Sequence, residues 1–303
     1  MECILQEMAT DAIITYVDGR DPLWQQDYAL TIGSQKPLTK RFRDWGTLPY
    51  LLRSIRKYMP FVDNVYLVVA RESQIPAWVN EEKLKIVLHE DIMPRECLPS
   101  FSAAAIELFL HRIPGLKEQY IYFNDDFFVV QPLCEEDFFK DGKCFVGFSN
   151  CLFAYNMFKK QVRCADRVAR EAAGVAPGLF FKRPQHACAA MFKSCCEELF
   201  DKCGKDIFIP NAKPLRGEKS LCQYVYTDYA LFTGRAINRR ISKKHISLAT
   251  ATEKQISSFF DNPDKKTICI NDVEMSDARF LSLSEAISKS LEKKFPEKTE
   301  FEK

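Results

Sequence analysis

The residues of this 303-residue chain best suited to chemistry are two adjacent carboxylates at the end of an apolar run. Residues 120–123 are Tyr, Ile and Phe, which favour strands, and Asn124, Asp125 and Asp126 follow directly. A buried parallel strand that ends in carboxylates opens onto a ligand crevice, and Mg²⁺ prefers carboxylate oxygens. Adjacent strand residues point to opposite faces, so we expect one aspartate to face the metal and the other to fix the turn. A plain turn is the alternative, because Asn and Asp are common turn residues.

The composition is that of a globular protein, with 47% hydrophobic and 28% charged residues. No run approaches the roughly 18 apolar residues of a membrane span, and the first residues lack the features of a secretory signal. The twelve Cys are scattered and are interpreted as reduced, mostly buried thiols. We therefore expect a cytoplasmic protein. A net charge of +2 without a dense basic stripe argues against a nucleic-acid partner, and leaves peripheral association with the inner face of a membrane open.

Strands alternate with helices through the first half of the chain. The expected strands are residues 11–17, 65–70, 84–88 and 120–123; the expected helices are residues 48–58, with Thr47 as N-cap, and a later helix capped by Ser100. The first strand ends in a turn-rich cluster at residues 18–22. This alternation predicts an α/β fold with a mostly parallel sheet flanked by helices.

The pattern changes in the second half, which we expect to be helical cover from about residue 150. Helical periodicity is present at residues 157–173, 188–199 and, less clearly, 219–232. A late strand is expected at residues 267–270, followed by Asn271 and Asp272. We expect a single α/β domain over residues 1–275. Residues 276–303 are expected to be an exposed C-terminal helix with a fraying tail.

Four blocks of residues, taken in order, match a known pattern. They are Asp18, Gly19, Asp21 and Pro22 after the first strand; the stretch from Arg41, Phe42, Arg43 and Asp44 through Arg53 to Asn124, Asp125 and Asp126; Arg183, Pro184, Gln185 and His186, followed by Arg216; and, more weakly, Cys269 to Asp272. In these blocks the chain resembles the Stealth family of bacterial capsular-polysaccharide phosphotransferases. The family often has other residues where this chain has Tyr16, Pro49 and Ala189, which leaves substrate detail open.

The resemblance implies a fold similar to the nucleotide-sugar transferases, of the GT-A or Rossmann-like type, with residues 1–275 as the catalytic domain. It implies transfer of a hexose or N-acetylhexosamine 1-phosphate from a UDP-sugar to a hydroxyl of a glycan or lipid-linked glycan. The products would be a phosphodiester and UMP, in capsular or surface polysaccharide synthesis. Such a transfer uses Mg²⁺ or Mn²⁺, which Asp125 and Asp126 would hold. A metal-dependent glycosyltransferase that releases UDP and a noncatalytic glycan-binding relative are the alternatives.

The resemblance also assigns roles to single residues. His186 is the expected general base, because an imidazole with a pKa of roughly 6.5 suits proton transfer at neutral pH. Arg216 is expected to bind the phosphoryl oxygens and, with His186 and Asp126, to form the catalytic set. The expected donor and phosphate ligands are Asp18, Gly19, Arg41, Asp44, Arg53 and Asn124. For Arg53, a structural role in which it braces Asp44 or another carboxylate is weighed equally with phosphate binding.

Overall fold

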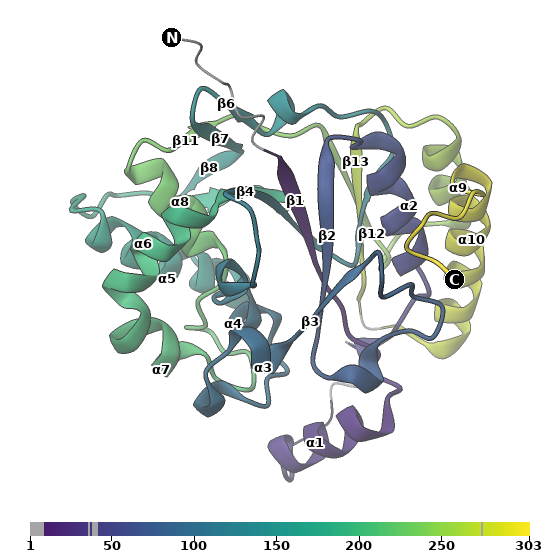
Figure 1. The fold of residues 1–303 in the computed structure, drawn as a ribbon, viewed down its shortest axis with the longest axis horizontal. Coiled ribbons are helices and arrows are strands. Elements are labelled where there is room, and N and C mark those ends of the chain that lie inside the picture. The colour runs from purple at the N-terminus through teal and green to yellow at the C-terminus, as the bar shows by residue number, and fades with distance from the viewer. Residues whose placement is uncertain (1–8, 36, 38–41, 274) are drawn as a thin grey trace.

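A five-stranded sheet forms the centre of the protein (Figure 1). The computed structural model describes residues 9–35, 37, 42–273 and 275–303, so Arg41 lies outside the described residues. The strand order is β10 (Ala189–Phe192), β4 (Gln119–Asn124), β1 (Thr10–Thr15), β2 (Val62–Val69) and β3 (Lys85–Leu88). Four strands are parallel, and β10 pairs antiparallel with β4. The expected fold class, a mostly parallel sheet with flanking helices, is confirmed.

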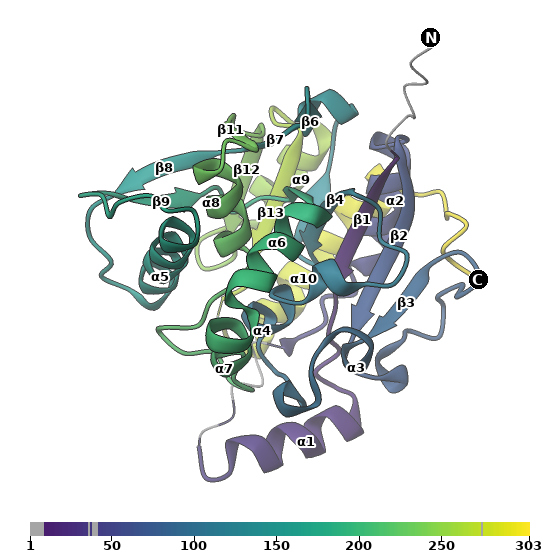
Figure 2. The same cartoon turned by 60° about the vertical axis from the view of Figure 1, so that its left-hand side comes forward.

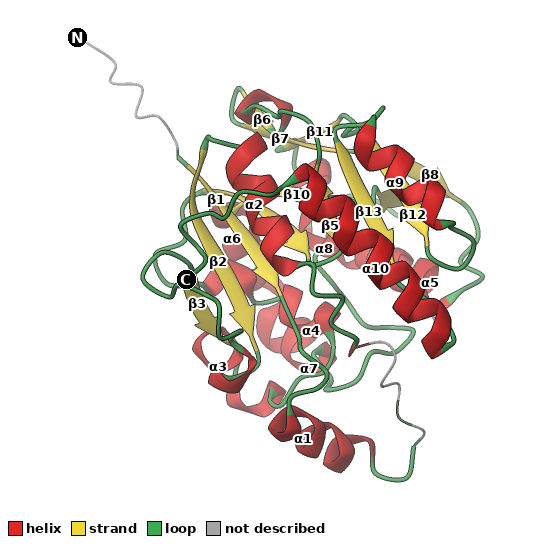
Figure 3. Cartoon of the chain, turned by 90° about the vertical axis from the view of Figure 1, so that its right-hand side faces the viewer, coloured by secondary structure: helices red, strands yellow, loops and turns green. Residues whose placement is uncertain are grey.

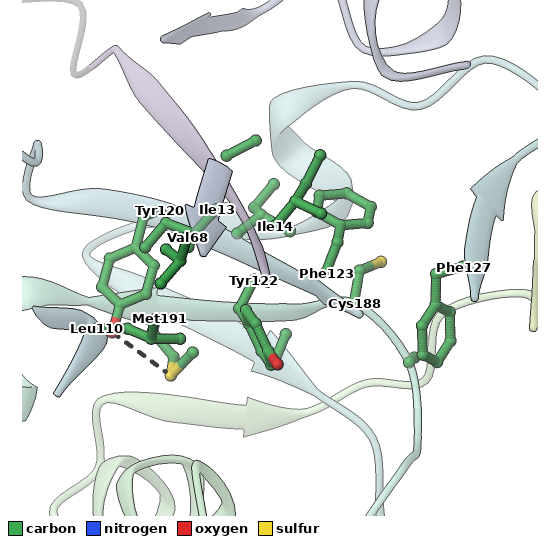
Figure 4. Close-up of a cluster of buried hydrophobic side chains, with 14 of the residues drawn as sticks. Ile13, Ile14, Val68, Leu110, Tyr120, Tyr122, Phe123, Phe127, Cys188 and Met191 are labelled. Carbon is green, nitrogen blue, oxygen red and sulfur yellow. Dashed lines mark hydrogen bonds between the residues drawn. The ribbon is translucent and has the colours of Figure 1, made fainter. Parts of the chain in front are cut away.

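Both faces of the central sheet are buried, as expected for parallel strands with near-continuous apolar sequences. Ile13 and Ile14 are neighbours in β1 and point to opposite faces, yet both are fully buried. Figure 4 shows them among the side chains of β2, β4 and β10. Tyr120 donates a hydrogen bond from its hydroxyl to the Met191 sulfur at 3.6 Å, which joins β4 to β10 within the core.

Helices cover the sheet on two sides (Figure 1). One side carries α2 (Leu48–Tyr58), α9 (Glu253–Asp261) and α10 (Asp277–Lys294); the other carries α4 (Ala103–Glu107), α5 (Met157–Ala172), α6 (Lys193–Cys203), α7 (Ile209–Asn211) and α8 (Tyr224–Phe232). Two more helices, α1 (Pro22–Ile32) and α3 (His89–Ile92), lie near the carboxyl ends of the strands. Among the described helices, none has the length and apolar character needed to cross a membrane.

Three smaller sheets accompany the central one. They are β12 (Lys243–Ser247), β13 (Thr267–Asn271) and β5 (Phe127–Val129); β11 (Ala236–Asn238), β7 (Lys143–Val146) and β6 (Phe139–Lys140); and the ribbon of β8 (Phe148–Cys151) and β9 (Phe181–Pro184). The late strand expected near residue 267 is confirmed, although it pairs with β12 and β5 and not with the central sheet. Figure 3 shows α10 packed across this region.

The second half is not only helical cover, which corrects the prediction made from its periodicity. Residues 188–199 were expected to form one helix, but they form β10 and the start of α6. The run Ala189–Phe192 is apolar at every position, and such a short run fits a buried strand as well as a helix. Pairing with β4 decides for the strand. The first-half elements and α5 agree with prediction, except that Ser102 and not Ser100 caps α4.

The C-terminal tail is packed against the protein and does not fray, so that prediction is also wrong. Phe295 and Phe301 are almost fully buried. Arg53, on α2, donates to both carboxylate oxygens of Glu302 at 2.9 and 2.7 Å and to the Phe295 carbonyl at 2.7 Å. Aromatic burial and a buried ion pair therefore hold the last residues. The many Lys and Glu residues around Phe295 and Phe301 led to the prediction of an exposed tail.

Candidate active site

A cavity of about 330 Å³ opens where several strands end. Tyr16 follows β1, Ala70 follows β2, Asp125 follows β4 and Asp272 follows β13, and all four line it. Because β1 and β4 are parallel and pair Thr15 with Asn124, their ends reach the same edge of the sheet. Ligands of open α/β sheets bind at this edge. The cavity is therefore the candidate active site.

Among the described residues, four carboxylates line this cavity, from Asp44, Asp125, Asp126 and Asp272. Asp44 lies in the loop before α2 and accepts a hydrogen bond from Arg20 Nη2 at 3.0 Å. Asp272 accepts one from Trp45 Nε1, also at 3.0 Å. Segments far apart in the chain thus direct acids into one space, which favours a cation as ligand.

The two adjacent aspartates have pKa values well above the ordinary range. Burial, followed by the charges of Asp126 and Asp44, raises the pKa of Asp125 to about 7. Burial also raises the pKa of Asp126 to about 6, although the hydrogen bond from Cys269 opposes the change. Asp126 Oδ1 is buried and has no hydrogen-bond partner among the described residues. An oxygen with unused acceptor capacity beside other buried acids fits a hard divalent cation, so the residues present suit Mg²⁺ or Mn²⁺.

His186 lies next to Asp126, two residues after the end of β9. One ring nitrogen, a carboxylate oxygen of Asp126 and the sulfur of Cys269 all lie within 4.8 Å of one another. His186 Nδ1 is 3.2 Å from the Tyr224 hydroxyl. Burial, followed by the charge of Lys243, lowers the pKa of His186 to about 4, so the ring is neutral at neutral pH. His186 is not among the residues that line the cavity, and Asp126 connects the two.

The same three side chains have the spacing of a metal-ligand set that includes a thiol. Burial raises the pKa of Cys269 far above that of an ordinary thiol, and the nearby Asp126 raises it further. The sulfur is therefore protonated and donates to Asp126 Oδ2 at 3.3 Å. A protonated thiol is a poor metal ligand, so the oxygen-rich cavity side of Asp126 suits a cation better.

Arg216 brings a positive charge to the cavity from the loop before α8. Its Nε and Nη2 donate to Gln161 Oε1 at 2.9 and 2.5 Å, and the Gln161 amide donates to the Gly217 carbonyl at 2.6 Å. Gln161 is almost fully buried on α5, so it fixes the direction of the guanidinium. The remaining N–H groups of Arg216 are suited to an anion.

Asn124 is oriented by a buried network beneath the cavity. Its Nδ2 donates to the Tyr122 hydroxyl at 3.0 Å, and Tyr122 in turn lies 2.8 Å from Thr15 Oγ1 and 3.2 Å from Glu107 Oε1. Burial raises the pKa of Glu107 to about 7, against the lowering effect of the Gln223 N–H. The network ties β1, β4 and α4 together, and two of its members, Thr15 and Asn124, line the cavity.

Arg43 was not selected from the sequence, but the structure places it in the cavity wall. Its Nη2 pairs with Asp277 at 3.1 Å, whereas its buried Nη1 has no hydrogen-bond partner among the described residues. Arg41, two positions earlier in the sequence and predicted as a ligand, lies outside the described residues. Together, Arg43 and Arg216 give the acidic cavity two guanidinium groups.

Three other predicted ligands are not in the cavity lining. The prediction that Arg53 binds phosphate is wrong, because its guanidinium donates to Glu302 and to the Phe295 carbonyl. Bracing a carboxylate was the alternative role considered for Arg53. Asp18 binds the backbone N–H and the side chain of Arg20. Gly19 does permit close approach, but of Phe42: a Cβ at Gly19 would lie 2.2 Å from the Phe42 carbonyl oxygen. Chain packing thus explains this glycine.

Asp272, Gln161 and Tyr224 were also missed as site residues. Asp272 had a usable signal, since it follows an apolar strand as Asp125 does. Gln161 had none, because it acts through Arg216, a partner distant in sequence.

Comparison with known proteins agrees with the family resemblance seen in the four sequence blocks. Residues 41–146 match the family model described as Stealth protein CR2, conserved region 2. The exopolysaccharide phosphotransferase cps2G of Lactiplantibacillus plantarum is 30% identical over 328 residues, which cover 97% of this chain and 96% of that protein. The receptor polysaccharide phosphotransferase WefC of Streptococcus oralis is 42% identical over 139 residues, 43% of this chain and 41% of that protein.

A second streptococcal relative gives a similar local match. The capsular polysaccharide phosphotransferase WcwK of Streptococcus pneumoniae is 40% identical over 139 residues, which span 43% of this chain and 41% of the relative. Among solved structures, the galactosyltransferase LgtC in complex with donor and acceptor sugar analogs has a TM-score of 0.47 and 12% identity, covering 96% of this chain and 98% of that one. The chain belongs to the Stealth family of polysaccharide phosphotransferases.

Proposed function

We propose that this protein transfers a hexose or N-acetylhexosamine 1-phosphate from a UDP-sugar to a hydroxyl of a glycan acceptor. The acceptor oxygen forms a bond to the phosphorus next to the sugar, the pyrophosphate bond to that phosphorus breaks, and UMP leaves. The observation that carries the proposal is the cavity itself: four acids and two arginines at the strand ends, with His186 beside Asp126. Phosphoryl transfer relies on positioning and charge neutralisation, which such a set supplies.

The cavity acids are suited to hold Mg²⁺ or Mn²⁺. Asp125 and Asp126 are the main candidates, and Asp272 and Asp44 face the same space. When bound, the cation would neutralise the donor diphosphate and polarise its phosphoryl oxygens. Arg216, fixed by Gln161, would bind the oxygens of the phosphoryl group in transfer, and Arg43 would bind the single phosphate of the leaving UMP.

His186 would take the proton of the acceptor hydroxyl. In the tautomer that donates Nδ1–H to Tyr224, the lone pair of Nε2 is left to accept it. Its lowered pKa keeps the ring in the neutral, proton-accepting form throughout the neutral range. The adjacent Asp126 carboxylate would offset the charge that the imidazolium gains.

The test is the product formed from a panel of UDP-sugars with Mg²⁺. UMP requires attack at phosphorus and supports the proposal, whereas UDP means attack at the sugar carbon and would make the protein a glycosyltransferase. Donor binding without any turnover would point to a noncatalytic glycan-binding relative.

The base is tested with His186→Ala, which should lower turnover roughly 10²- to 10⁴-fold while donor affinity stays near that of the native protein. His245→Ala is the matched control, because His245 is an exposed histidine on the neighbouring strand β12. A near-normal rate for His186→Ala at neutral pH would refute the assignment.

A further inference from the structure

Exposed apolar side chains gather at the outer end of the β8–β9 ribbon. Of the ten large hydrophobic side chains that are exposed in the described part of the chain, six lie in two short segments, residues 152–157 directly after β8 and residues 179–180 directly before β9. We call them the apolar tip: Leu152, Phe153, Tyr155, Met157, Leu179 and Phe180. The two segments meet because β8 and β9 pair up to Cys151 and Phe181, and Leu152 and Phe180 are the next residues outward.

The apolar tip is strongly exposed. Phe153, Tyr155 and Leu179 expose 71%, 74% and 77% of their surface. In Figure 2 the ribbon reaches outward beyond α8, with α5 beneath it. Single exposed hydrophobic residues are common, but a group of them on one projecting element marks a binding surface.

The segment that carries the apolar tip is rich in basic residues. Residues 148–184 contain seven Lys or Arg and two Asp or Glu, a net charge of +5, whereas the whole chain carries +2. The rest of the protein is therefore net negative. The Lys159 ammonium lies 4.1 Å from the centre of the Tyr155 ring, and Arg163 and Arg167 are exposed on successive turns of α5. This segment thus combines apolar and cationic side chains on an otherwise acidic molecule.

We propose that the apolar tip docks the protein on an anionic lipid bilayer. The aromatic and aliphatic side chains would enter the boundary between headgroups and acyl chains, and the basic side chains of α5 and β9 would contact lipid phosphates. A glycan would use the aromatic faces but gives no role to the exposed leucines or to the excess of positive charge. A bilayer accounts for all three features.

The docking surface is close to the candidate active site along the chain. Strand β9 begins beside the apolar tip and ends at Pro184, two residues before His186. At about 3.3 Å per residue, the six steps from Phe180 to His186 span at most about 20 Å. A lipid-linked glycan in the same bilayer would reach His186 over this short distance. This last step rests on the proposed function, whereas the docking itself does not.

The test uses the purified full-length chain and vesicles of phosphatidylcholine with about 30% phosphatidylglycerol, which supply the negative surface. Phe153→Ser with Leu179→Ser should reduce the bound fraction at least about tenfold, because two inserted apolar side chains are lost. Leu30→Ser with Leu281→Ser is the matched control, since these leucines of α1 and α10 expose 77% and 66% of their surface. It should bind as the native chain does.

The charge contribution is tested separately with Arg163→Glu and Arg167→Glu, which avoid the apolar residues. This variant should lose binding to anionic vesicles, and salt near 1 M should weaken binding by the native chain. Failure of the native chain to bind these vesicles, or unchanged binding by the Phe153 and Leu179 variant, would overturn the proposal. A solution dimer that this variant disrupts, without vesicle binding, would assign the surface to a second copy and also overturn it.

The docking and the proposed function fail in different ways. Vesicle binding is measured without substrate, so binding by a protein that forms no UMP would leave the docking intact. Release of UMP in the absence of vesicles should be unchanged by the Phe153 and Leu179 variant, because these exposed residues are not in the cavity lining.

Discussion

At the scale of single residues, Asp126 connects the two parts of the candidate site. Its Oδ2 accepts the Cys269 thiol, its Oδ1 has unused acceptor capacity, and its carboxylate lies beside His186. The Ile270 N–H also binds its backbone carbonyl at 2.9 Å, which fixes the residue against β13. The backbone bond and the Cys269 thiol position this carboxylate before any ligand arrives.

Replacing this carboxylate tests its role in metal binding. Asp126→Asn should weaken Mg²⁺ binding at least about tenfold, because an amide oxygen lacks the charge that a hard cation prefers. Titration calorimetry with Mg²⁺ measures the change. Asp18→Asn is the control, since Asp18 binds Arg20 outside the cavity lining. An unchanged titration for Asp126→Asn would count against the proposed ligand.

A substitution at Arg216 tests whether the planar guanidinium group, and not only its charge, is required for turnover. Arg216→Lys keeps the charge but loses Nε, and with it the paired contact to Gln161. We expect turnover to fall roughly 10²-fold, comparable with the loss of one donor to a transition-state oxyanion. Gln161→Leu, which removes the anchor and keeps the arginine, should show a smaller decrease. Native activity in Arg216→Lys would make this residue a bystander.

At the scale of elements, the C-terminal tail depends on α2. Arg53→Met would leave Glu302 buried without its cation, since the Glu302 side chain is only 5% exposed. We expect a loss of about 3–5 kcal/mol in the free energy of unfolding, measured with urea. Arg53→Met combined with Glu302→Gln should recover part of it. A phosphate-binding role would instead raise the KM for the donor with little loss of stability.

The elements near one another in sequence were the ones that could be predicted. Periodicity and turn residues predicted helix α2 and strands β1 to β4. The same signals placed Asn124 and Asp125 at the carboxyl end of a strand. The sequence could not distinguish strand β10 from a helix, because its four consecutive apolar residues show no periodicity. Its pairing with β4 makes it a strand. The Gln161 contact to Arg216 joins residues 55 positions apart, which no local pattern encodes.

At the scale of the whole molecule, the cavity acids link stability to pH and to metal. The pKa values of Asp125 and Asp126 in the folded protein, about 7 and about 6, lie above the ordinary value of 3.8. Protonation therefore favours the folded state, and this stability is lost as the pH rises from 4 through 7. A divalent cation that binds the ionised pair should restore it.

We therefore expect Mg²⁺ to stabilise the protein more at high pH. At a concentration a hundredfold above its dissociation constant, Mg²⁺ should raise the melting temperature by roughly 4 °C at pH 8. The rise should be less than half as large at pH 5, where protons compete for the carboxylates. Scanning calorimetry gives both values. Equal shifts at the two pH values, or an undiminished shift in Asp126→Asn, would contradict the linkage.

The cavity wall is assembled from segments at opposite ends of the chain, as the bond between Trp45 and Asp272 shows. These two residues are 227 positions apart in a chain of 303, so the ribosome makes about three quarters of the protein between them. A nascent chain without β13 therefore has an open half-site that lacks one of its acids. The complete acidic cavity therefore forms only after residue 272 has been added, late in synthesis.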